Sequence, residues 1–168
     1  MKYEIAIKDL PECIVYYKRG EIATFDDISE FVLKSAEECR VANPNIQCTD
    51  DGYCFVAFME RPIDGKPVKI EYAQSVKTMG KETDNIKFRK LKSTSAVCVK
   101  HKGPYEEMGK AYEKLVLWML DQGLRASEPP REYYIKGPWD CGNKHEWITE
   151  IEIPIDHTWI AKNDAVQK

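Results

Sequence analysis

Two glutamates, Glu71 and Glu150, occupy the middle of strand-like segments and are the residue types best suited to chemistry in this chain. Glu150 lies in the run WITEIEIPI, where strand alternation places Trp147, Thr149 and Ile151 on one face and Glu150 on the other. An ordinary sheet exposes such an acidic face to water, because glutamates are rarely buried without a partner. In a desolvated, aromatic-lined cleft the same carboxylate takes a raised pKa or requires a cationic partner. Both interpretations stay open at this point.

Glu71, in VKIEYAQSV, occupies the corresponding place about 80 residues earlier in the chain. Lys69 shares its face and offers an ordinary ion-pair partner, which is the alternative to a role in a cleft. If Glu71 and Glu150 face one cleft, their repulsion keeps one of them protonated near neutral pH. That arrangement suits general acid–base catalysis, so the two are the catalytic residues expected if the protein is an enzyme.

Four aromatic side chains accompany these carboxylates and are expected to form the walls of a ligand site. Trp139 and Trp147 bracket a loop, Tyr134 lies on the preceding strand-like segment, and Tyr72 follows Glu71 directly. Aromatic residues in strands more often belong to the core, which is the competing interpretation. For a flat or cationic ligand, each such ring contributes on the order of 1 kcal/mol through stacking and cation–π contacts.

Two amphipathic helices and a set of strands must position these residues. The apolar spacing predicts one helix over about residues 26–41 and a second between Pro104 and Gly123. The segments around them are rich in β-branched and aromatic residues and are separated by glycine, proline and aspartate turns. The predicted class is therefore α+β, with two helices serving a largely antiparallel sheet.

The order strand, helix, strand, strand occurs twice along the chain. The first repeat covers about residues 1–80 and the second about residues 84–156, followed by a short C-terminal tail over 157–168. The order of elements supports this duplication more strongly than the few shared residue identities. We therefore expect one domain over 1–168, with a ligand cleft between the two repeats.

Composition excludes several classes of function. The 28 acidic and 25 basic residues are interspersed and give a net charge of −3, so nucleic-acid binding is disfavoured. There is neither a signal-peptide core nor an apolar run of membrane-spanning length, which predicts a cytoplasmic protein without a membrane partner. The histidines and the six cysteines lack zinc-site spacing, and nucleotide-binding motifs are absent from the sequence. We therefore expect neither a metal nor a cofactor.

Three short motifs in the second half resemble the GyrI-like small-molecule-binding domain family. This family includes the effector-binding domains of multidrug-sensing regulators such as BmrR and Rob. The motifs are a His-x-Gly-Pro-Tyr turn into the second helix (His101, Gly103, Pro104, Tyr105), an Arg-Glu-x-Tyr strand (Arg131, Glu132, Tyr134) and a terminal TEIEIPI strand (Thr149 to Ile155).

The resemblance implies two strand-helix-strand-strand modules, a ligand cleft between them and a buried glutamate near its centre. It also implies a stand-alone member, because no DNA-reading segment accompanies the repeats in this sequence. The expected function is binding of a hydrophobic, cationic or polycyclic small molecule, with Glu150 as the charge partner. Two family roles remain as alternatives: a hydrolase of cyclopropane-containing genotoxic natural products that uses the glutamates, and a protein-interaction factor resembling a gyrase inhibitor.

Overall fold

The protein is described by a computed structural model, which covers residues 2–156. The expected tail over 157–168 lies outside the described residues. Within them the chain forms antiparallel strands and two α-helices, which confirms the α+β class. Neither helix in this described part is long and apolar enough to cross a membrane.

The strands and helices of the described residues form two compact units, residues 12–92 and residues 2–11 together with 93–156. The first comprises β2 (Cys13–Ile22), α1 (Ile28–Ala42), β3 (Cys54–Phe58), β4 (Val68–Val76) and β5 (Lys87–Leu91). The second comprises β1 (Ile5–Leu10), β6 (Thr94–Lys102), α2 (Gly109–Asp121), β7 (Arg131–Lys136) and β8 (Ile148–Pro154). We call them the 12–92 unit and the β6–β8 unit.

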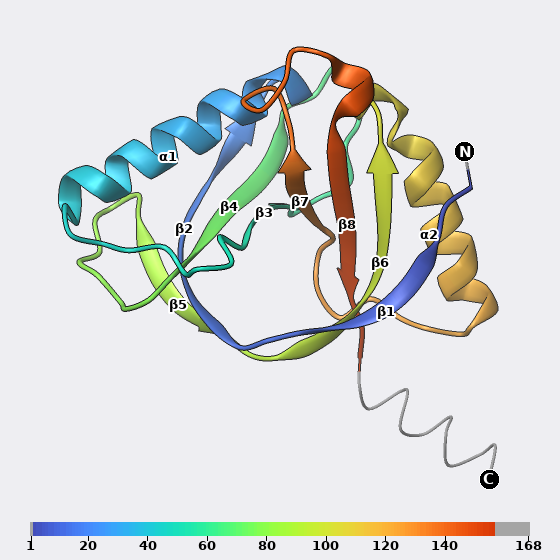
Figure 1. Cartoon of the computed structure of the whole chain (residues 1–168), viewed down its shortest axis with the longest axis horizontal. Helices are drawn as coiled ribbons and strands as arrows, with labels where there is room; N and C mark the ends of the chain where they lie inside the picture. Colours follow the sequence, from blue (N-terminus) through green and yellow to red (C-terminus); the bar gives the residue numbers. More distant parts are fainter. Residues whose placement is uncertain (1, 157–168) are drawn as a thin grey trace, which may run out of the picture. The chain divides into compact units, whose positions relative to one another are not determined.

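Each unit has the predicted order of elements along the chain, but the strand pairing moves β1 and β5 each into the unit formed by the other half of the sequence. In the 12–92 unit the order is β3-β4-β2-β5, and in the β6–β8 unit it is β1-β6-β8-β7, all antiparallel. The first strand of the chain, β1, thus pairs with β6 (Figure 1), while β5 pairs with β2. Each unit contains a strand-helix-strand-strand core plus one further strand contributed from beyond that core.

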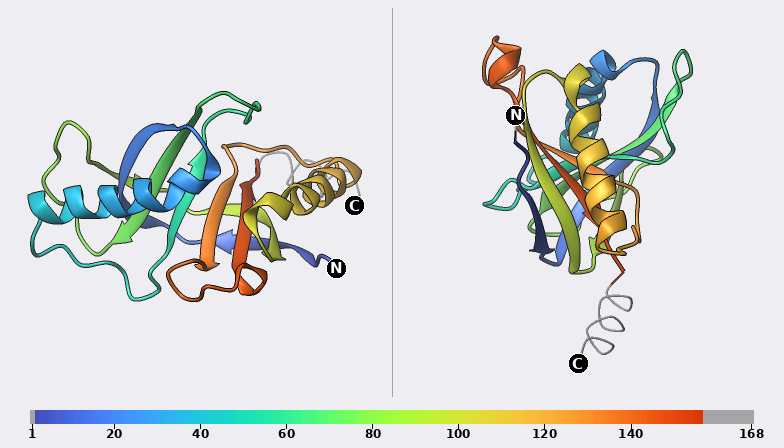
Figure 2. Two further views of the ribbon diagram at one scale, coloured as in Figure 1. Left: turned by 90° about the horizontal axis from the view of Figure 1, so that it is seen from above. Right: turned by 90° about the vertical axis from the view of Figure 1, so that its right-hand side faces the viewer.

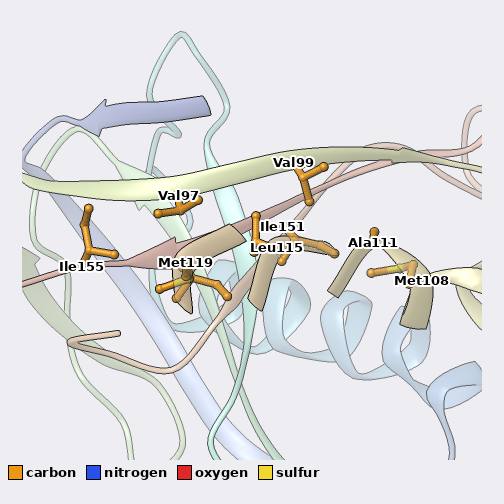
Figure 3. Packing of buried hydrophobic residues seen from close by; sticks show 9 residues of the cluster. Val97, Val99, Met108, Ala111, Leu115, Met119, Ile151 and Ile155 are labelled. Atoms are coloured by element: carbon orange, nitrogen blue, oxygen red, sulfur yellow. The ribbon is translucent and has the colours of Figure 1, made fainter. Parts of the chain in front are cut away.

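Helix α2 covers one face of the β6–β8 unit (Figure 2). Alternation along β6 and β8 turns Val97, Val99 and Ile151 toward the helix, and Leu115 and Met119 of α2 pack on them (Figure 3). Leu115, Val97 and Ile151 are fully buried. The helix ends where expected, because Gly123 adopts a φ of 65° and the backbone N–H of Leu124 bonds to the carbonyl of Met119.

Helix α1 packs against β2 in the 12–92 unit, and Gly20 sets how closely the two approach. A Cβ atom at Gly20 would lie 2.5 Å from Cε2 of Phe31, so only glycine admits that ring against the strand. Lys18 extends over the same ring and forms an ion pair with Glu38 of the helix. The α1-facing side of this sheet therefore carries the even-numbered residues of β2.

Candidate functional site

A buried carboxylate, Glu132, lies at the centre of an aromatic group in the β6–β8 unit. Strand register places Glu132 opposite Ile151 and Tyr134 opposite Thr149, so both side chains of β7 point toward α2. The Tyr112 hydroxyl, from α2, donates to Oε1 of Glu132 at 2.7 Å, and the Tyr134 hydroxyl donates to Oε2 at 2.6 Å. The carboxylate is thus fixed by one phenol on each oxygen and is 6% exposed.

Burial dominates the electrostatics of this group. It raises the pKa of the Glu132 carboxyl to about 7, and the hydrogen bonds from Tyr134 and Tyr112 offset the effect only in part. The same burial, together with the neighbouring Glu132, raises the pKa of both Tyr112 and Tyr134 well above the usual range of a phenol. Near neutral pH the phenols therefore stay protonated, whereas the Glu132 carboxyl is partly protonated and partly ionised. A carboxyl with this property can act as a counter-ion or as an acid.

Three further rings extend the group toward the surface. Tyr105 lies 5.3 Å from Tyr134 and 4.8 Å from Trp147, measured between ring centroids. Trp139 packs edge-on against Tyr134 at 6.3 Å, and its side chain is 56% exposed. The indole N–H of Trp147 donates to the carbonyl of Cys141 at 3.0 Å, which fixes that ring against the loop. We call Glu132, Tyr112, Tyr134, Tyr105, Trp139 and Trp147 together the Glu132 site.

His101 holds the turn that presents Tyr105 to this site. Its Nε2 donates to the carbonyl of Pro104 at 3.2 Å, because a carbonyl oxygen can only accept, and its Nδ1 shares a hydrogen bond with the Tyr3 hydroxyl at 3.0 Å. Gly103 completes the turn with a φ of 131°, a conformation that favours glycine. The His-x-Gly-Pro-Tyr segment therefore sets the position of one wall of the site.

Glu150 lies on the other face of the same sheet. It is 5% exposed, and its Oε2 accepts a hydrogen bond from Nζ of Lys8 at 2.6 Å. Lys8 belongs to β1, so the exchanged strand supplies the partner of this carboxylate. A pocket of about 340 Å³ adjoins the pair and is lined by Lys2, Glu4, Lys8, Cys98, Lys100 and Glu150, among others. Glu150 is thus buried and ion-paired, and it does not share a face with Tyr134.

Glu71, in the 12–92 unit, is held by two arginines and not by Lys69. Arg19 donates from Nε to Oε2 of Glu71 at 2.8 Å, and Arg89 bonds both carboxylate oxygens. Burial alone would raise the pKa of Glu71, but the hydrogen bonds from Arg89 and Arg19 outweigh it and lower the pKa. The guanidinium of Arg89 also lies 4.1 Å above the centre of the Tyr17 ring. Glu71 therefore serves as the buried anionic centre of an ion-pair network whose two guanidinium groups reach solvent.

The four predicted aromatic residues lie in different places: one is in the 12–92 unit and three are in the Glu132 site. Tyr72 follows Glu71 on β4 and so points to the opposite, α1-facing side, where its hydroxyl donates to Oε1 of Gln74 at 3.0 Å. Its ring packs edge-on against Tyr16 at 6.1 Å. The structure thus brings Tyr134, Trp139 and Trp147 together, and the predicted cleft between the repeats stays a prediction.

Glu132 is a buried carboxylate that the sequence analysis did not include among the candidate site residues. The Arg-Glu-x-Tyr motif contained the signal, because it places a glutamate two residues before Tyr134 and therefore on the same face of a strand. The partner Tyr112 lies 20 residues earlier on a helix. Only the packing of α2 on the sheet brings the two side chains together.

Comparison with known proteins gives one family and a set of related structures. The family described as the GyrI-like small molecule binding domain matches residues 3–156. The crystal structure of the EcmrR C-terminal domain is 36% identical, with a TM-score of 0.86, over 93% of this chain and 99% of that one. In the EcmrR–DNA complex, the match covers 92% of this chain but 57% of EcmrR, so the chain spans little more than half of that relative.

Two more distant structures share the fold. SAV2435, solved bound to tetraphenylphosphonium, is 18% identical with a TM-score of 0.56, over 94% of this chain and 96% of that one. A hydrolase encoded by lin2189 of Listeria innocua is 12% identical with a TM-score of 0.62, over 91% and 92% of the two chains. No curated protein matches the sequence.

Proposed function

Because the chain belongs to the GyrI-like small-molecule-binding domain family, we propose that it binds hydrophobic cations, including polycyclic ones, at the Glu132 site. The observation that carries this proposal is the lack of a counter-ion at Glu132. Over residues 2–156, no lysine, arginine or histidine forms an ion pair with its carboxylate, whereas Glu71 has two arginines and Glu150 has Lys8. A cationic ligand supplies the missing charge.

The energetics of the site favour such a ligand. A buried carboxylate without a counter-ion is costly, which is why its proton is retained up to about pH 7. A cation that enters the site stabilises the ionised carboxylate. It also contacts the faces of four aromatic rings, those of Tyr105, Tyr134, Trp139 and Trp147. Each such contact is worth about 1–2 kcal/mol when water is excluded. Charge and aromatic area thus select for lipophilic cations over neutral compounds.

A permanently charged cation provides the direct test. We expect tetraphenylphosphonium to quench tryptophan fluorescence and to bind more tightly as the pH rises from 5 to 8, because only the protein titrates. Glu132 is protonated below its pKa of about 7, so the affinity should fall about tenfold per pH unit below that value. Isothermal titration calorimetry at each pH measures this directly. Affinity that is independent of pH, or no binding at any pH, contradicts the proposal.

A second function, ring-opening hydrolysis, is favoured by the raised pKa of Glu132, which keeps a fraction of the carboxyl protonated near neutral pH. A carboxylic acid with a pKa of about 7 can protonate the carbon released when a strained cyclopropane opens, while water adds to the electrophilic carbon. Glu71 and Glu150, the pair expected from the sequence, are both held in ion pairs and are less suited to donating a proton. We expect a cyclopropane-bearing alkylating natural product to gain the mass of one water, as detected by mass spectrometry. Equal product with the Glu132→Gln variant would exclude this function.

A further inference from the structure

Thr149 carries a buried hydroxyl that has no hydrogen-bond partner among the residues that the structure describes. Its side chain is fully buried, with 0% exposure. Leaving a buried hydroxyl unpaired is destabilising, and a valine of the same shape avoids that cost. Such groups are rare in folded proteins, and each calls for an explanation.

The strand register shows where the hydroxyl lies and why its neighbours leave it unpaired. Thr149 sits between His101 of β6 and Tyr134 of β7, on the face that α2 covers. Both ring nitrogens of His101 are already bonded, to Tyr3 and to the Pro104 carbonyl, and the Tyr134 hydroxyl is bonded to Glu132. The polar side-chain groups of these two cross-strand neighbours therefore each have another partner.

Thr149 is also a near neighbour of the carboxylate. Glu132 is opposite Ile151, and Thr149 is two residues from Ile151 on β8, so Glu132 and Thr149 are diagonal neighbours across the sheet. Residues in this relation lie about 7–8 Å apart and can contact the same long side chain or ligand. The unpaired hydroxyl thus borders the Glu132 site.

From these contacts we propose that Thr149 is a specificity-determining residue of the Glu132 site. Its hydroxyl forms a hydrogen bond with a hydroxyl or carbonyl group of a ligand whose cationic centre lies at Glu132. The ligand class is therefore a lipophilic cation with a polar group several ångströms from its charge. This inference rests on the proposed function. Because Glu132 and Thr149 are both buried, the ligand reaches them only when neighbouring side chains move.

A matched pair of ligands and a matched pair of variants test the assignment. The ligands are tetraphenylphosphonium and its analogue with one para-hydroxyphenyl ring, which differ by a single hydroxyl a ring's length from the phosphorus. We expect wild-type protein to bind the hydroxylated cation about tenfold more tightly, the value of one buried hydrogen bond. Thr149→Val should remove this preference and bind the two cations equally. Thr149→Ser, which retains the hydroxyl, should keep the preference.

The melting temperature of the free variants provides a second readout. Thr149→Val should melt at the same temperature as wild type or higher, because it removes an unpaired polar atom. A lower melting temperature would show that the hydroxyl is already satisfied in the free protein, and would overturn the assignment. Equal binding of the two cations to wild type, or a preference retained in Thr149→Val, overturns it as well. Failure of tetraphenylphosphonium to bind wild type overturns the proposed function and this assignment together.

Discussion

Replacing Glu132 with glutamine is expected to weaken the binding of tetraphenylphosphonium about 100-fold, or about 3 kcal/mol. The substitution removes the negative charge but keeps the shape and one accepting oxygen. The amide can still accept from one phenol and donate to the other, so the hydrogen bonds with Tyr112 and Tyr134 are replaced. The loss of affinity therefore measures the contribution of the negative charge on Glu132. Isothermal titration calorimetry at pH 8, where wild-type Glu132 is ionised, gives the largest difference.

The variant should remain folded, which separates lost binding from lost structure. The pKa of Glu132 is raised in the folded state, so the folded protein holds its proton more tightly than the unfolded chain. The ionised carboxylate then lowers stability as the pH rises from the ordinary glutamate value through about 7. Above pH 7 the glutamine variant should be at least as stable toward urea as the wild type.

Glu150→Gln is the matched control, because it is also a buried glutamate of the β6–β8 unit but lies on the opposite face. If Glu150 is the charge partner expected from the sequence, this variant loses affinity and Glu132→Gln does not. We expect the reverse, since Lys8 already neutralises Glu150. An equal loss in both variants would contradict the assignment of the cation to Glu132.

The elements of the fold follow from local sequence, whereas the partners of the charged residues do not. The apolar spacing over residues 28–42 and the glycine at 123 determine where the helices lie, because periodicity and capping are local properties. The repeat in element order predicted the strand-helix-strand-strand core that each compact unit contains. It did not reveal that β1 and β5 pair outside the expected order, because nothing in either segment encodes its neighbour.

The pairing of β1 with β6 and of β5 with β2 supplies a counter-ion to each of the two predicted glutamates. Lys8 reaches Glu150 across 142 positions of sequence only because β1 pairs with β6. Arg89 reaches Glu71 because β5 lies beside β2, and it joins Arg19, which lies opposite Glu71 in the β2–β4 pair, where the sequence suggested Lys69. A mid-strand glutamate can thus be recognised from sequence, but its counter-ion depends on strand order. Glu132 was missed for a different reason: its partner Tyr112 lies on a helix, and neither strand alternation nor strand order brings those two side chains together.

Replacing Glu71 with glutamine is expected to destabilise the protein by about 3 kcal/mol without weakening the binding of tetraphenylphosphonium. Glu71 is 2% exposed, and removing its charge leaves Arg19 and Arg89 facing each other without an anion between them. Breaking a buried pair from one side typically costs about 3–5 kcal/mol, and we expect the lower end because the side chain of Arg19 is exposed and that of Arg89 is partly exposed. Urea unfolding followed by fluorescence at pH 7 measures the difference in free energy of unfolding.

The dependence on pH identifies the ion pair as the cause. The pKa of Glu71 in the folded protein lies below its ordinary value of 4.5, so its stabilising contribution is complete above that value. The contribution is lost as the pH falls through the folded-state pKa, and the gap between wild type and variant should close there. Glu37→Gln, which removes an exposed partner of Arg40, is the control and should change stability little at any pH. A carboxylate that binds the ligand contributes to affinity, whereas one that pairs with the arginines contributes to the stability of the fold. If the Glu71→Gln protein were as stable as wild type but bound the cation poorly, Glu71 would belong to the ligand site instead.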